Sequence, residues 1–255
     1  MNIEFGYDTS TQTVTVPEER LLAVLEPGAF PPAAGSEEDL VRAALAAPIG
    51  APPLREVVHA GEKIVLVTSD ISRPMPTWKV MPAVLEELYA AGVQPEDITL
   101  VFARGVHRAH TDAERRHLAG EQAFSEITCI DSDPEDCLCL GTTRRGTPVE
   151  IMRTVAEADR RICLGNIEFH YFAGYSGGVK AIMPGVSTPA AIQSNHKLMV
   201  QDASCAGNLD TNPVRQDIEE AGRICGVDYL VNVVLDEHKH IVYGVAGDAA
   251  EAHRA

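Results

Sequence analysis

Short apolar runs of strand length recur along this chain, and segments with the spacing of amphipathic helices separate them. Strands that are apolar on both faces are typical of a parallel sheet covered by helices on both sides. A polar alternation opens the chain, and two further strand-like runs stand close together near its end. The sequence therefore predicts an α/β, Rossmann-like fold, with a small N-terminal β-hairpin and antiparallel strands near the C-terminus.

The elements follow from local patterns. Residues 3–7 and 13–16 alternate as strands do, on either side of a polar turn, and predict the hairpin. The run from Ser36 to Asp39 has the form of a capping box and predicts that a helix begins there. The later predicted strands are residues 64–67, 98–102, 127–130 and 161–164, with 229–235 and 240–245 as antiparallel neighbours. The later predicted helices are residues 76–91, a helix capped by Thr111, and residues 149–158, 188–199 and 214–225.

Composition limits the functional class. The chain has 255 residues and a formal net charge of −16, which argues against nucleic acid and anionic membrane surfaces as partners. An anionic ligand would therefore need positive charge concentrated in a cleft. We expect no signal peptide, since the first residues lack a basic and an apolar region, and no run reaches the roughly 18 apolar residues that span a bilayer.

The six cysteines do not form a disulfide framework in a chain of this size, and they suit a reducing, cytoplasmic location. Cys137 and Cys139 could bind metal, but their spacing is weak support. For domain organisation, we expect one domain over residues 1–247. Residues 248–255 are expected to begin a helix that connects to a C-terminal domain absent from this chain.

Polar side chains follow three of the predicted strands. Asp70 and Arg73 follow the first, His107 follows the second, and His170 follows the strand at 161–164. Because ligands of open α/β sheets bind outside the carboxyl ends of the strands, we expect these residues to converge on one active site. Taken singly, each has a structural explanation: Asp70 as a turn cap, Arg73 as a surface ion pair.

The segment between Gly165 and Gly185 is rich in glycine and contains Lys180. Glycines allow a backbone to approach a ligand closely, and bunched amides can bind an anion. A lysine just past such a loop can contact phosphate or act as a nucleophile. The alternative is a surface loop with a solvated lysine. His196 follows on a predicted helix, where a surface position is the simpler interpretation in isolation.

These pieces together resemble the N-terminal domain of the nickel-pincer-nucleotide-dependent lactate racemase family. The resemblance is carried by residues 69–74, residues 105–108, the segment from His170 to Gly185, and Asn195-His196. Its order and spacing extend from about residue 63 to about residue 196.

The resemblance implies a role for each matching residue. Lys180 resembles the lysine joined to the cofactor through a thioamide, and His196 the nickel ligand. His107 and His170 resemble the paired acid/base histidines, and Arg73 the arginine that holds the substrate carboxylate. Asp70 resembles a polar partner near the substrate or the cofactor. The further cofactor contacts expected are Ser69, Ser176, Gly177 and Gly178.

The implied cofactor is pyridinium-3-thioamide-5-thiocarboxylic acid mononucleotide with Ni(II), loaded by cofactor-biosynthesis proteins. The implied reaction is racemisation or epimerisation of a 2-hydroxy acid such as lactate by hydride transfer to and from that cofactor. Two histidines suit this reaction, because the hydroxyl proton must be removed and returned for either orientation of the substrate. The alternatives are a non-catalytic nucleotide- or phosphate-binding module, and a zinc hydrolase that uses a helical His107/His110 pair.

Overall fold

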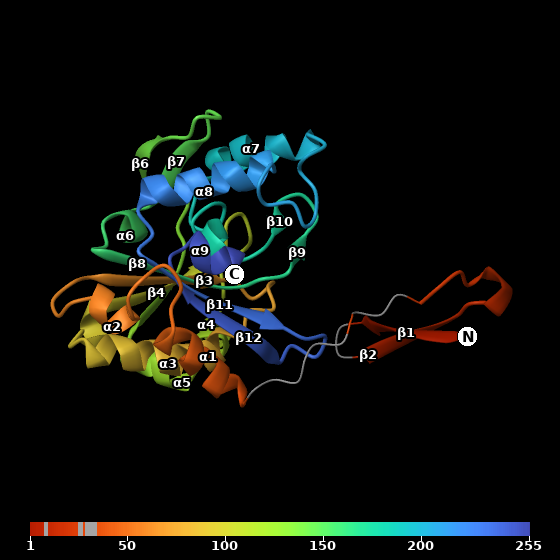
Figure 1. Cartoon of the computed structure of the whole chain (residues 1–255), viewed down its shortest axis with the longest axis horizontal. Helices are drawn as coiled ribbons and strands as arrows, with labels where there is room; N and C mark the ends of the chain where they lie inside the picture. The colour runs from red at the N-terminus through yellow and green to blue at the C-terminus, as the bar shows by residue number, and fades with distance from the viewer. Residues whose placement is uncertain (8–9, 25–27, 29–34) are drawn as a thin grey trace. The chain divides into compact units, whose positions relative to one another are not determined.

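The structure, a computed structural model, describes residues 1–7, 10–24, 28 and 35–255 (Figure 1). The chain divides into two compact units, residues 1–31 and residues 32–255. The predicted single domain over 1–247 does not anticipate this division. Its physical basis is the scarcity of buried side chains in the first unit, whose strand residues are almost all exposed.

The first unit contains the predicted hairpin. Strands β1 (Asn2–Tyr7) and β2 (Ser10–Thr15) pair antiparallel, and a short 3-10 helix η1 (Glu18–Arg20) follows. The polar turn expected between the strands includes residues 8 and 9, which lie outside the described residues.

The second unit is built on a six-stranded sheet with the order β12-β11-β8-β3-β4-β5. Its strands are β3 (Ile64–Ser69), β4 (Ile98–Ala103), β5 (Thr128–Asp131), β8 (Arg160–Asn166), β11 (Tyr229–Leu235) and β12 (Ile241–Gly247). All neighbouring strands run parallel except β11 and β12, which are antiparallel. The predicted fold class is therefore confirmed.

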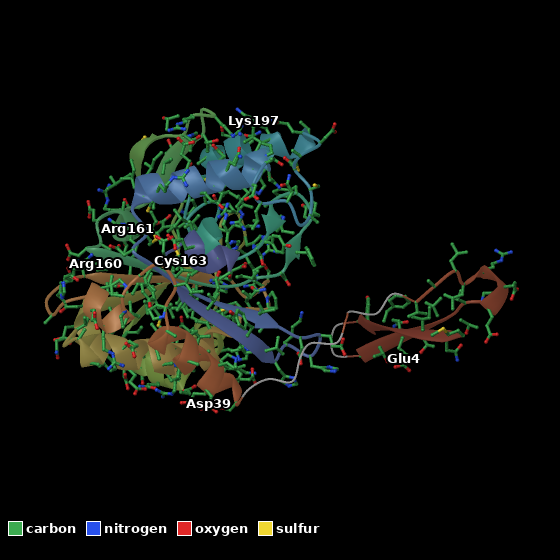
Figure 2. All side chains as sticks on the ribbon, viewed as in Figure 1. Glu4, Asp39, Arg160, Arg161, Cys163 and Lys197 are labelled. Carbon is green, nitrogen blue, oxygen red and sulfur yellow. The ribbon has the colours of Figure 1, made fainter. Side chains whose placement is uncertain are left out.

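Both faces of the sheet are covered. In β3, Ile64 and Leu66 belong to one buried apolar cluster, while Val65 and Val67 belong to another. This alternation follows from the two-residue period of a strand. Cys163 of β8 is likewise buried within the sheet (Figure 2).

Two layers of helices lie on these faces, as Figure 1 shows. The first cluster includes residues from α1 (Glu37–Ala46), α2 (Leu54–Val57), α3 (Thr77–Ala90), α4 (Asp112–Ala119) and α5 (Glu121–Glu126). The second includes residues from α7 (Pro189–His196), α8 (Pro213–Cys225) and α9 (Glu251–Arg254). The capping boxes of Ser36 with Asp39 and of Thr111 with Glu114 are both present. The remaining short elements are η2 (Pro95–Asp97), α6 (Arg153–Ala156), β9 (Phe169–His170), β10 (Gly174–Tyr175), η3 (Gly178–Ala181) and η4 (Lys197–Val200).

One predicted helix is wrong. Residues 149–158 do not form a single helix, because β7 (Pro148–Met152) pairs antiparallel with β6 (Cys137–Thr142) and only the four residues of α6 are helical. Val149 and Ile151 alternate into the second buried cluster, so tertiary burial outweighs the local helix propensity of this run.

The last helix packs against the sheet of its own unit. In α9, Ala252 and His253 are buried, and the helix contacts β11 and β12. The expectation that this segment leads to another domain stays a prediction. In the described part of the chain, no helix is long and apolar enough to cross a membrane. All six cysteines are free thiols.

Candidate functional site

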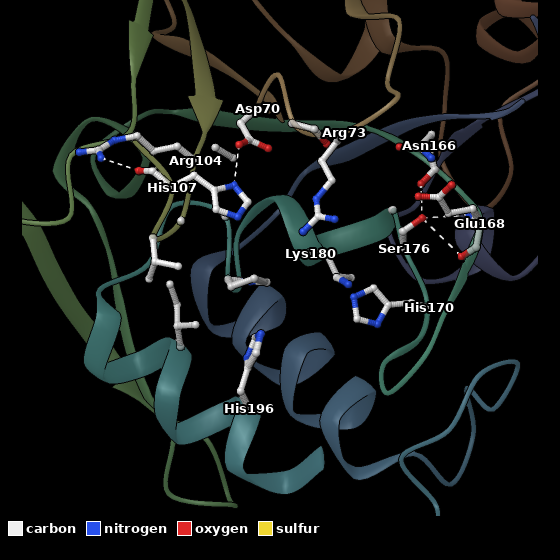
Figure 3. Close-up of a pocket in the computed structure, with 18 residues that line it drawn as sticks. Asp70, Arg73, Arg104, His107, Asn166, Glu168, His170, Ser176, Lys180 and His196 are labelled. Atoms are coloured by element: carbon white, nitrogen blue, oxygen red, sulfur yellow. Dashed lines mark hydrogen bonds and ion pairs between the residues drawn. The ribbon is translucent and has the colours of Figure 1, made fainter. Parts of the chain in front are cut away.

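A cavity of about 170 Å³ opens at the carboxyl ends of β3, β4 and β8 (Figure 3). The sheet adds β4 and β5 on one side of β3, and β8 and β11 on the other. The chain connections on the two sides of β3 therefore run in opposite directions. Open α/β sheets form their ligand crevices at such a point. The predicted site residues in the lining are Ser69, Asp70, Arg73, His107, His170, Ser176, Gly177, Lys180 and His196.

Asp70 and His107 form a hydrogen-bonded pair. Asp70 Oδ2 lies 2.6 Å from His107 Nδ1, and the Ser72 hydroxyl donates to Asp70 Oδ1 at 2.9 Å. The carboxylate is buried, whereas the imidazole, which lines the cavity, is 44% exposed. An ionised carboxylate only accepts hydrogen bonds, so the proton of a neutral His107 is held on Nδ1 and Nε2 presents its lone pair.

His170 is held in the opposite sense. The backbone N–H of Ala173 donates to His170 Nδ1 at 3.2 Å, so a neutral His170 carries its proton on Nε2. The ring stacks on Tyr171, and Phe172 packs against it edge-on. Burial, reinforced by the positive charges of Lys180 and Arg73, lowers the pKa of His170 to about 3.

The glycine-rich turn is shaped by its neighbours. Gly177 and Gly178 have φ values of +68° and +62°, where side chains are strained. A Cβ on Gly177 would lie 2.6 Å from Asn232 Oδ1. The N–H of Gly178 donates to that same oxygen at 2.7 Å.

This hydrogen bond bears on one expectation. Gly178 does not line the cavity and its amide donates to Asn232, so its expected contact with the cofactor stays a prediction. Gly178 instead permits the turn that places Lys180. Ser176 does line the cavity, although its hydroxyl also donates to the carbonyl of Asn166 at 2.7 Å.

Lys180 lies on η3, directly after the turn, and projects into the cavity beside His170 (Figure 3). Burial is the main cause that lowers its pKa to about 7, and the guanidinium groups of Arg215 and Arg73 act in the same direction. Arg73 reaches the cavity from the loop after β3. The basic side chains of Arg73, Arg104 and Lys180 thus share the lining with the carboxylates of Asp70 and Glu168.

His196 is the last residue of α7. That helix begins at Thr188, whose hydroxyl accepts the N–H of Ala191 at 3.2 Å. Burial and Lys180 lower the pKa of His196, and the Ile192 carbonyl partly opposes them. Its Nδ1 is buried and has no hydrogen-bond partner among the residues that the structure describes.

His110 serves the framework. It stands in the loop before α4, so it does not form a helical pair with His107 as the zinc alternative requires. Its Nδ1 lies 2.6 Å from Asp131 Oδ1, and its Nε2 accepts the N–H of Ile71 at 3.1 Å. Both ring nitrogens are thus occupied, and over residues 1–7, 10–24, 28 and 35–255 no group of three potential metal ligands occurs.

Sequence reasoning missed two residues beneath the turn. Arg215 of α8 is 1% exposed and donates to the carbonyl of Tyr175 at 2.7 Å. His253 of α9 lies 2.7 Å from the carbonyl of Ser176 through Nε2. Burial lowers the pKa of Arg215 to about 10 and that of His253 to about 4. The sequence gives no sign that Arg215 is buried, because it is a single arginine on an amphipathic helix. Asn232, which accepts from Gly178 in the same turn, did give a signal, because it is a polar residue within an apolar strand.

Fold and cavity together define a class: a doubly wound α/β domain with a ligand site, lined by histidine, arginine and lysine, where the sheet order reverses. Comparison with known proteins then places the chain within that class. The family described as "Lactate racemase N-terminal domain" matches residues 7–207, and the chain belongs to this family.

Two curated relatives are similar over nearly the whole chain. The lactate racemase of Thermoanaerobacterium thermosaccharolyticum is 32% identical over 258 residues, covering 99% of this chain and 60% of the relative. The lactate racemase of Lactiplantibacillus plantarum is 31% identical over 258 residues, covering 99% of this chain and 61% of the relative. The chain therefore spans about three fifths of the length of these relatives.

Solved structures agree on the fold. The lactate racemase apoprotein of T. thermosaccharolyticum superposes with a TM-score of 0.84 at 32% identity, covering 100% of this chain and 60% of that one. A protein from Thermotoga maritima superposes with a TM-score of 0.67 at 20% identity, covering 82% of this chain and 54% of that one, which is a likeness of fold alone.

Proposed function

We propose that this chain provides the cofactor- and substrate-binding site of a racemase for a 2-hydroxy acid such as lactate. The observation that carries the proposal is the placement of two imidazoles of opposite tautomer, His107 and His170, in one cavity with Arg73. The relatives named lactate racemase support the same reaction.

The residues present fit a tethered nickel pincer nucleotide. His196 lines the cavity, and desolvation favours its neutral form, which is the form that binds metal. The arginine and lysine side chains of the lining suit the phosphate of a nucleotide. Lys180 would hold the pyridinium group and His196 the nickel. When bound, that group supplies the acceptor and donor of the substrate's C2 hydride.

The chain's own residues then bind the substrate and move its hydroxyl proton. The guanidinium of Arg73 offers the planar fork that pairs with a carboxylate. His107 Nε2, with its lone pair directed to the cavity, takes the hydroxyl proton, while Asp70 stabilises the imidazolium that results. His170 presents an N–H at Nε2 to the substrate oxygen in the other orientation. The two imidazoles thus present complementary groups at Nε2, a proton acceptor on His107 and a hydrogen-bond donor on His170.

The tether is tested by intact mass. Protein co-expressed with the cofactor-making enzymes is expected to carry an adduct that is lost in Lys180→Ala, with nickel content lost in His196→Ala. The matched control is Lys239→Ala, because Lys239 is exposed at the turn between β11 and β12. An unmodified wild-type mass under those conditions overturns the proposal.

The arginine and lysine side chains of the lining also favour a second candidate, a non-catalytic module that binds nucleotide or phosphate reversibly. In that case Lys180→Ala weakens nucleotide binding, measured by calorimetry, while His107→Ala and His170→Ala leave it unchanged. For the racemase, the two histidine variants abolish the interconversion of the substrate enantiomers, measured by chiral chromatography, and retain the adduct.

A further inference from the structure

Lys180 differs from Lys63 and Lys79 in its partners. Lys63 pairs with Asp97, and Lys79 pairs with Glu37 at 2.6 Å. Among the described residues, no carboxylate lies within ion-pair distance of Lys180 Nζ, although the side chain lines the cavity. The amine thus points into the cavity where a ligand would bind, and it forms no ion pair with the described residues.

The neighbours of Lys180 favour its uncharged form. Arg215 lies beneath the glycine-rich turn and Arg73 enters from the loop after β3, and both are cations. Glu168 opposes them, as the smallest of the contributions. A lysine that is desolvated and placed near another cation becomes a nucleophile near neutral pH, because the free amine is then populated.

The other side chains of the cavity determine which kind of ligand would lie beside this amine. The Arg73 guanidinium points into the same space as the Lys180 amine, with His170 beside that amine (Figure 3). A carboxylate bound to Arg73 would place the adjacent carbon of a small acid towards Lys180. A carbonyl at that carbon is the functional group with which an amine condenses.

We propose that Lys180, while no cofactor is attached to it, captures small 2-oxo acids as an imine, with Arg73 holding their carboxylate. The amine lone pair adds to the C2 carbonyl and forms a C–N bond, while the carbonyl oxygen takes a proton. The C–O bond of this carbinolamine then breaks, a C=N bond forms, and the two N–H protons of the amine leave with the oxygen as water. The step needs no oxidant or reductant, and it does not depend on the proposed racemase chemistry.

The experiment traps the imine. The 255-residue protein, produced in a host without the cofactor-making enzymes, is incubated with pyruvate at neutral pH and reduced with borohydride. Hydride converts C=N to a stable secondary amine, so intact mass is expected to increase by one reduced pyruvate group per chain. Peptide mapping of the wild-type protein is expected to place that group on Lys180, and this measurement depends on no variant.

Three comparisons sharpen the result. Lys180→Met is expected to abolish trapping, whereas Lys239→Met, at an exposed lysine, leaves it unchanged. Acetone, which has the carbonyl but no carboxylate, is expected to be trapped about tenfold less efficiently, as loss of one charge-assisted hydrogen bond predicts. Arg73→Gln is expected to reduce trapping of pyruvate by about the same factor and to leave acetone unaffected.

The outcomes are distinct. Label spread over surface lysines, or unchanged trapping in Lys180→Met, overturns the proposal. Label on Lys180 that is equal for pyruvate and acetone overturns the assignment of 2-oxo acids as the ligand class. The adduct with the nickel nucleotide is measured on a different preparation, so either result can fail without the other.

Discussion

Asp70 Oδ2 lies 2.6 Å from Nδ1 of His107, and this contact determines which nitrogen of the imidazole faces the cavity with a free lone pair. The two residues come from different strand ends, β3 and β4, which pair in parallel register. The carboxylate is buried and the imidazole is partly exposed, so we expect Asp70 to act through His107.

We predict that Asp70→Asn lowers the racemisation rate by about 10²- to 10⁴-fold, because an amide can donate to Nδ1 and reverse the tautomer. Binding of the cofactor, followed by intact mass, is expected to be unchanged. Ser72→Ala is the matched control: the Ser72 hydroxyl donates to Asp70 and lies 3.3 Å from His107 Nδ1, and its loss leaves the carboxylate in place. If Asp70→Asn instead loses the adduct and keeps the rate per loaded protein, Asp70 is a cofactor ligand.

Stability is expected to fall on acidification, in part through His170. Its pKa is about 3 in the folded protein against an ordinary value of 6.5, so between these pH values the unfolded chain binds more protons. The contribution is complete above about pH 6.5 and decreases by at most about 1.4 kcal/mol per pH unit towards pH 3. Urea unfolding of His170→Gln between pH 4 and 7 should give a shallower dependence than wild type.

The control for this pH dependence is His238→Gln, which removes an exposed histidine. It should reproduce the wild-type slope. Equal slopes for wild type and His170→Gln would show that His170 is not desolvated in the folded state.

An alanine in the glycine-rich turn is expected to lower the free energy of unfolding. Alanine at Gly178 would have a positive φ, and its Cβ would lie 2.8 Å from His253 Cδ2. Gly146 has a φ of +83° but nothing within 4 Å of the added Cβ, so it isolates the backbone cost. We predict a loss in the free energy of unfolding of about 1–2 kcal/mol for Gly146→Ala and about 3 kcal/mol or more for Gly178→Ala. Equal losses in the free energy of unfolding for Gly146→Ala and Gly178→Ala, measured by urea unfolding, would mean that the contact with His253 adds no destabilisation.

A buried carboxylate supports the helix that bears His196. Asp217 of α8 is fully buried and accepts from Thr143, from Thr147 at 2.7 Å and from Asn195 at 2.8 Å. We predict that Asp217→Ala lowers the free energy of unfolding by about 3 kcal/mol or more, because several buried donors lose a charged acceptor. Nickel binding should weaken as well, since Asn195 precedes His196.

The control for Asp217 is Glu220→Ala on the same helix. Glu220 lies 3.6 Å from Arg144, whose side chain is 94% exposed, so its removal should change the free energy of unfolding by less than about 1 kcal/mol. A similar loss in both variants, measured by urea unfolding, would contradict the role of the Asp217 network.

Much of the architecture could be predicted from sequence because its determinants are local. The apolar runs at β3, β4 and β8 are buried on both faces, and the caps at Ser36 and Thr111 satisfy backbone N–H groups within the same turn. The β6–β7 hairpin could not be predicted from sequence, because β6 carries no buried residue and residues 149–152 also suit a helix. There the pairing partner decided the conformation.

The sequence by itself determined the order of the elements and which residues lie at the carboxyl ends of the strands. It thereby determined the candidates Asp70, His107 and His170 and, through the family resemblance, Lys180 and His196. Only the tertiary structure decided what each of them does electrostatically. Protonation and the choice of ring nitrogen depend on burial and on hydrogen bonds to distant residues, such as Asp70 on His107 and Arg215 beneath Lys180. Such contacts leave no local pattern in the chain.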